Sequence, residues 1–139
     1  MFEIAVDISY VIKIIFAIVV GFTIGFERQI HSHDAGIKTN ILICISACVC
    51  SIMSYSISGA DIGRIAAQIL PGIGFIGAGC ILKDKKNIRG LTTASILLVT
   101  ASLGLCIGFG YYFLAFVSVF LMQATLFIIK KVEHLWRKK

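Results

Sequence analysis

Long apolar runs separated by short polar segments dominate this chain. A transmembrane helix needs about 20 mostly apolar residues, and five runs approach that length. The spans are predicted at about residues 8–26, 41–57, 64–82, 91–107 and 109–129. The pattern therefore predicts an all-α, polytopic helical membrane protein with about five transmembrane helices in one domain over residues 1–139, ending in a basic tail at 130–139.

Composition supports the same class. Hydrophobic residues make up 58% of the chain and charged residues only 14%, whereas soluble domains average about 25% charged residues. The first ten residues lack the basic start of a cleavable signal peptide, so none is expected. All five cysteines lie within apolar runs. We interpret them as packing residues; a metal site at Cys44 and Cys48 is the alternative.

The net charge of +6 is distributed in a way that predicts orientation. Of the 13 Lys and Arg residues, all but Lys13 and Arg64 follow the first, third or fifth span. Basic residues are retained on the cytoplasmic side of a membrane. The N-terminus is therefore predicted outside and the C-terminus in the cytoplasm. The basic residues form no stripe with exposed aromatics, so nucleic-acid binding is not expected.

The third span has an unusual content of glycine. Arg64, Gln68, Gly72, Phe75 and Gly79 fall on one helical face. We expect Gln68 to point into the bundle and the glycines to allow close helix packing. Pro71 predicts a kink in this helix, with a broken helix as the alternative. The GxGxxG spacing of residues 72–77 follows no strand, so it does not indicate a dinucleotide site.

Two further features concern the helix ends. The GxxxG of Gly21 and Gly25 predicts a close helix contact, and the glycines at 104, 108 and 110 predict a short turn between the last two spans.

In the fourth span Thr92, Ser95 and Ser102 share a face, with Thr93 and Thr100 beside it; these hydroxyls are predicted to form hydrogen bonds between helices. Glu27 and Arg89 are predicted to form an ion pair.

Four segments together resemble the MgtC/SapB family: GFERQ at 25–29, AGIKTN at 35–40, RIAAQIL with GIGFIGAG at 64–79, and IRGLTTAS at 88–95. The resemblance implies a bacterial inner-membrane protein linked to magnesium limitation and, in some pathogens, to survival inside macrophages. Longer members carry a cytoplasmic ACT-like domain after the membrane part, so the short SapB-like branch is the closer analogy. Pro71 and Lys38 depart from the family's usual small residue and arginine.

The candidate functional residues are the polar and glycine positions of these segments: Glu27, Arg28, Lys38, Thr39, Arg64, Gln68, Gly72, Gly74, Gly77, Gly79, Arg89, Gly90, Thr92 and Thr93. No nucleophile–base pair is visible, so an enzyme is not expected, nor are a catalytic residue, cofactor or resident metal site. The His31, His33 and Asp34 loop is interpreted as a solvated polar segment.

Two functions remain open from the sequence. The first, which the resemblance implies, is a non-enzymatic protein that modulates a membrane partner such as the ATP synthase and so affects magnesium or ion homeostasis. The alternative is a transporter or channel for magnesium or another cation. Spans that conduct ions usually contain ionisable groups, and none of the seven acids lies deep within a span. Besides the lipid bilayer, a second copy of the chain is an expected partner.

Overall fold

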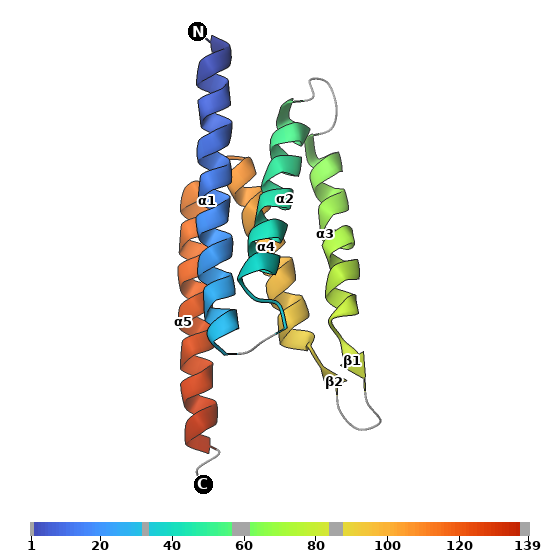
Figure 1. The fold of residues 1–139 in the computed structure, drawn as a ribbon, viewed down its shortest axis with the longest axis vertical. Helices are drawn as coiled ribbons and strands as arrows, with labels where there is room; N and C mark the ends of the chain where they lie inside the picture. Colours follow the sequence, from blue (N-terminus) through green and yellow to red (C-terminus); the bar gives the residue numbers. More distant parts are fainter. Residues whose placement is uncertain (1, 32–33, 57–61, 84–87, 137–139) are drawn as a thin grey trace.

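A computed structural model describes residues 2–31, 34–56, 62–83 and 88–136 of the chain. It contains five helices and one short antiparallel hairpin (Figure 1). The helices are α1 (Phe2–Ile30), α2 (Ile37–Ser56), α3 (Ile62–Gly79), α4 (Leu91–Gly108) and α5 (Tyr112–Trp136). Strands β1 (Leu82–Lys83) and β2 (Ile88–Arg89) join α3 to α4, with Leu82 opposite Arg89.

The predicted all-α, polytopic membrane fold is confirmed. Apolar stretches long enough to cross a membrane occur in α1, α2, α4 and α5, whereas α3 has a shorter one, Ala67–Gly79. The third span was predicted to reach residue 82, but the chain leaves the helix after Gly79 and enters β1. Helix α3 continues through Pro71, so the alternative of a broken helix is wrong.

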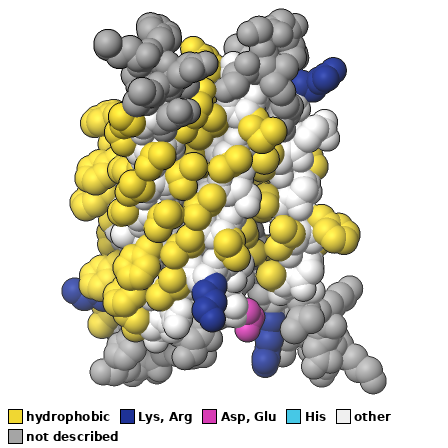
Figure 2. Space-filling model, turned by 45° about the horizontal axis from the view of Figure 1, so that its top comes forward, with side chains coloured by type: hydrophobic (Ala, Val, Ile, Leu, Met, Phe, Trp, Pro, Cys, Tyr) yellow, Lys and Arg dark blue, Asp and Glu magenta, His cyan; other side chains and the backbone are white. Residues whose placement is uncertain are grey.

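Helices α1, α2 and α4 form the centre of the bundle, and α3 and α5 flank it on opposite sides (Figure 1). Helix α1 begins at one end of the bundle and α5 finishes at the other. The α1–α2 connection, the β hairpin and the end of α5 share this second end, which we call the basic end. Figure 2 shows hydrophobic side chains across the middle of one face. That the basic end faces the cytoplasm stays a prediction.

Glycines set the spacing of the three central helices. A Cβ on Gly25 would lie 2.5 Å from Ile37 Cα, and one on Gly21 would lie 2.7 Å from Ile41 Cα. The close contact predicted from this GxxxG is therefore confirmed. On α4, a Cβ on Gly104 would lie 2.3 Å from the Cys44 carbonyl oxygen. Gly104 and Gly108 thus pack against α2 inside the helix, and the prediction that they form a turn is wrong; Gly110, with φ +90°, makes it.

The glycine face of α3 does not pack within the chain as predicted. A Cβ on Gly72, Gly74 or Gly79 would meet nothing within 4 Å, and only Gly77 contacts another helix, at Ala94. Gln68 is exposed as well, so the prediction that it points into the bundle is wrong. Lipid and protein interior are both apolar, so the sequence pattern does not say which face of α3 is buried.

A fully buried polar residue, Asn40, joins three parts of the bundle. Asn40 is fully buried, and its side-chain nitrogen donates to the Ala35 carbonyl at 3.1 Å and the Gly36 carbonyl at 2.9 Å. The Thr100 hydroxyl on α4 lies 3.0 Å from Asn40 Oδ1 and 2.8 Å from the Ile96 carbonyl. Asn40 therefore holds the α1–α2 connection, α2 and α4 together.

Other hydroxyls of α4 behave differently from the prediction. Ser95 donates to the Leu91 carbonyl at 2.9 Å and Ser102 to the Leu98 carbonyl at 3.0 Å, both within their own helix. Thr92 is exposed, whereas Thr93 and Thr100 are buried. Bonds to other helices are therefore made by the buried hydroxyls, Thr93 with Arg28 and Thr100 with Asn40.

Candidate functional site: a polar cavity at the basic end

A cavity of about 550 Å³ opens between α1, α4 and α5 at the basic end. It is the region where the candidate residues from separate sequence segments meet. Its lining combines charged residues of both signs, two threonines and two aliphatic side chains. The lining residues are Glu27, Arg28, Asp34, Arg89, Gly90, Thr92, Thr93, Leu126, Ile129, Lys130 and Glu133.

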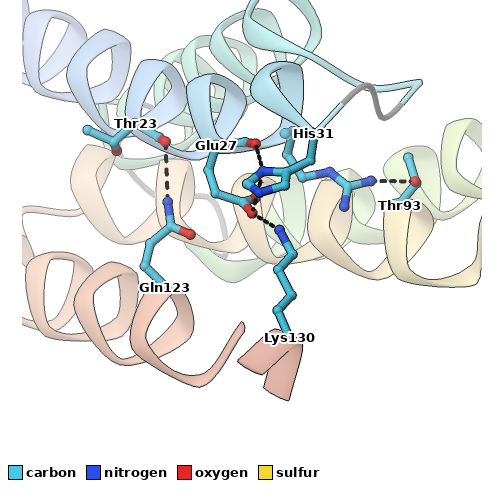
Figure 3. Close-up of polar contacts among 7 residues, drawn as sticks. Thr23, Glu27, His31, Thr93, Gln123 and Lys130 are labelled. Atoms are coloured by element: carbon cyan, nitrogen blue, oxygen red, sulfur yellow. Dashed lines mark hydrogen bonds and ion pairs between the residues drawn. The ribbon is translucent and has the colours of Figure 1, made fainter. Parts of the chain in front are cut away.

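Glu27 connects α1 to α5 on one wall of this cavity. Its carboxylate forms an ion pair with Lys130 Nζ and lies 3.4 Å from His31 Nδ1 (Figure 3). Nearby, Gln123 Nε2 on α5 donates to the Thr23 carbonyl on α1 at 3.2 Å. The Glu27–Arg89 pair predicted from the sequence is wrong, although both residues line the cavity.

Arg28 connects α1 to α4 on the opposite wall. Arg28 is only 3% exposed, and its Nη2 donates a hydrogen bond to Thr93 Oγ1 at 2.6 Å (Figure 3). Its Nε is buried and has no hydrogen-bond partner among the residues that the structure describes. Glu27 and Arg28 are adjacent in sequence, so they point about 100° apart on the helix and reach two different neighbours.

The N-terminus of α4 forms another part of the wall. Gly90 precedes it with φ +88°, and a Cβ there would lie 1.9 Å from the Cys80 carbonyl oxygen, so only glycine fits. No side chain caps the helix. The Gly90 carbonyl accepts the first helical bond, from Ala94 N at 2.9 Å. The preceding amides therefore have no intrahelical acceptor.

The cavity gathers some of the candidate residues and leaves others apart. Glu27, Arg28, Arg89, Gly90, Thr92 and Thr93 line it together. Lys38 and Thr39 lie on α2, the former exposed and the latter half-buried. Arg64 is exposed near the beginning of α3, at the other end of the bundle. Gln68 and the glycines 72, 74, 77 and 79 also lie on α3, away from the cavity.

Sequence reasoning missed the contribution of α5. Leu126, Ile129, Lys130 and Glu133 line the cavity, spaced by three, one and three residues along one helical face. That spacing was visible, but Lys130 was interpreted only as part of a basic tail. Asp34 was assigned to a solvated loop, and although it is exposed it also lines the cavity.

Residues 14–135 match the model of the MgtC family. The chain belongs to the MgtC family. Protein MgtC of Salmonella typhimurium is 42% identical over 103 residues, which cover 74% of this chain and 45% of that protein. Protein SapB of Bacillus subtilis is 37% identical over 140 residues, which cover 94% of this chain and 58% of that protein. YhiD of Escherichia coli K12 is 42% identical over 113 residues, covering 75% and 53%.

This MgtC family chain spans about half the length of the curated relatives it matches. No solved structure matches it. Family membership and the apolar helices identify a multi-pass protein of the bacterial cell (inner) membrane, as the resemblance implied. The matched residues include all of the residues that line the cavity.

The ion pair between Glu27 and Lys130 in this MgtC family member can be tested by exchanging the two charges. Glu27→Lys should lower the melting temperature in detergent, because it places two cations together where α1 meets α5. Adding Lys130→Glu should restore most of the loss. Adding Arg89→Glu instead should not. A partly exposed pair contributes about 0.5–1 kcal/mol, so matched melting curves are the measurement. Rescue by Arg89→Glu alone would reinstate the sequence-based pair.

Proposed function

We propose that the chain is a non-enzymatic membrane protein that supports magnesium homeostasis, or adaptation to low magnesium, by modulating a membrane partner such as the ATP synthase. The name of the E. coli relative YhiD marks it as a candidate magnesium transporter, which supports the link to magnesium. One structural observation carries the choice of modulation over transport: the buried side chains of Asn40, Thr100 and Ser51, where α2 packs against α4, are already hydrogen-bonded.

The interior of the bundle supports this choice in two ways. Asn40 and Thr100 bond to each other and to backbone carbonyls, and Ser51 bonds to the Cys48 carbonyl at 2.9 Å. Between these groups, α2 and α4 approach closely at Gly104 and Gly108. An ion path needs polar groups free to replace water around the ion. Side chains already engaged in such bonds are poorly suited to that task.

The flanking helices support the existence of a protein partner. Only 6% of the residues in the apolar window of α5 are buried, and Phe75 on α3 is 84% exposed. In lipid, helix association depends on packing of small residues and shape. The open glycine face of α3 therefore suits contact with another transmembrane helix, from a second copy of the chain or a different complex.

A magnesium transporter is the second candidate function. The observation in its favour is that Glu27, Asp34 and Glu133 line one cavity at the basic end. Magnesium prefers hard oxygen ligands and usually keeps several waters. Against it, Glu27 is already paired with Lys130, and the described residues contain no group of three or more potential metal ligands.

Purified protein in liposomes and affinity purification from membranes grown at low magnesium test the two candidates together. We expect no magnesium flux above empty liposomes, and recovery of a membrane complex that Phe75→Ala reduces severalfold. Lys131→Gln, a change at an exposed residue of the basic end that is not among the candidate residues, should not reduce it. Flux that is lost in Thr92→Ala or Gln68→Ala would contradict modulation and favour transport.

A further inference from the structure

The Arg28 side chain carries a buried positive charge that the protein compensates incompletely. The residue is 3% exposed, its hydrogen bond to Thr93 is to a neutral hydroxyl, and its Nε has no partner among the described residues. Burying a charge is costly unless it is paired and hydrogen-bonded. Arg28 also lines the cavity, so its side chain borders that space, although the Nε atom itself is buried.

Glu27 and Asp34 attract the Arg28 charge through space, but neither pairs with it directly. Glu27 is engaged with Lys130 and His31 on the other wall. The ion pairs within the described part of the chain are those of Glu27 with His31 and with Lys130. No carboxylate there lies within ion-pair distance of Arg28. Asp34 and Glu133 line the cavity but are exposed to the surroundings. Arg28 is therefore a cation of the cavity wall that no carboxylate binds directly.

The N-terminus of α4 adds to the same wall. A helix N-terminus carries about half a positive charge and presents free amides. Helix α4 is 18 residues long, no side chain caps its N-terminus, and Gly90 and Thr92 at this end line the cavity. Such an end binds anions, and phosphate groups in particular. Arg89 is exposed beside it on β2 and supplies a second guanidinium.

We propose that this cavity binds a phosphate group, carried by an anionic lipid headgroup or by a soluble phosphate compound. Guanidinium groups recognise phosphate with paired donors, and hydroxyls and amides complete such sites. The apolar stretches of α1 and α5 both end at the cavity, and Leu126 and Ile129 line its side. This depth is where lipid phosphates lie. The inference does not depend on the proposed function.

Two probes distinguish the sources of the phosphate. The full chain in detergent is melted with inorganic phosphate and with chloride at equal ionic strength. The full chain in nanodiscs is compared between phosphatidylcholine alone and mixtures with phosphatidylglycerol, and the lipids that stay bound are identified by native mass spectrometry. Stabilisation by inorganic phosphate supports a soluble source. Selective retention of phosphatidylglycerol supports a lipid source.

Variants connect binding to the proposed wall. Arg28→Gln should weaken binding of the effective probe about tenfold or more, the usual effect of losing a charge-assisted hydrogen bond. Arg89→Gln and Thr92→Val change exposed residues and should each weaken it severalfold; they remain informative if Arg28→Gln does not fold. Lys131→Gln removes the same charge from an exposed position outside this cavity and should leave binding unchanged.

Three results would overturn the proposal. The first is that neither inorganic phosphate nor phosphatidylglycerol binds more strongly than its control. The second is that binding is unaffected by both Arg89→Gln and Thr92→Val, or is weakened equally by Lys131→Gln, which would indicate general attraction to a basic protein. The third is stabilisation by magnesium chloride but by no anion, which would assign the cavity to its carboxylates.

Discussion

Alanine at Gly25 or Gly104 is expected to destabilise the protein strongly, whereas alanine at Gly72 or Gly74 is not. A Cβ at the first two positions would lie 2.5 Å from Ile37 Cα or 2.3 Å from the Cys44 carbonyl oxygen, and both are backbone atoms. Two central helices would have to separate. Overpacking of this kind costs about 1–3 kcal/mol or more, so the melting temperature in detergent should fall clearly.

The α3 glycines provide the matched control. A Cβ on Gly72 or Gly74 meets nothing within 4 Å, and alanine favours a helix over glycine by about 1 kcal/mol. Both variants should therefore melt at or slightly above the parent temperature. Equal damage from Gly25→Ala and Gly72→Ala would contradict the packing described for α3. Normal melting combined with loss of the membrane partner would place that partner on the glycine face.

These positions also show how far the sequence determines the fold. The spacing of Gly21 and Gly25 predicted a close contact, and the contact exists. Gly104 and Gly108 have the same spacing but were assigned to a turn, because a third glycine follows two residues later. A better signal was available: the apolar run continues without interruption through Gly104.

For the candidate site, local chemistry was easier to predict than partner choice. The motif residues Glu27, Arg28, Arg89 and Thr93 do line one cavity. The sequence could not select Lys130 over Arg89 as the partner of Glu27, since both were expected at the same end of the bundle. That choice depends on how α5 packs against α1, which no local pattern encodes. Likewise, Asn40 and Thr100 lie 60 residues apart in sequence.

The second large effect is expected at Asn40, because its fully buried side chain bonds to both the α1–α2 connection and α4. Asn40→Ala removes both side-chain bonds to the Ala35 and Gly36 carbonyls and leaves a small cavity in a fully buried position. Unsatisfied buried groups cost about 1–3 kcal/mol, and the lost packing adds to this. We expect the melting temperature to fall well below that of Ser46→Ala, whose exposed hydroxyl bonds only within its own helix.

A double-mutant cycle tests whether this effect passes through α4. Thr100→Ala alone should cost less than Asn40→Ala, since Asn40 keeps its two carbonyl bonds. If the 3.0 Å contact contributes to stability, the double variant should be less destabilised than the sum of the singles, by about 0.5–1 kcal/mol or more. Strict additivity would mean that Asn40 acts only on the α1–α2 connection. Because Asp34 lies in that connection and Arg28 lies just before it, and both line the polar cavity, coupling to Thr100 would also link the geometry of the cavity to the packing of α2 against α4.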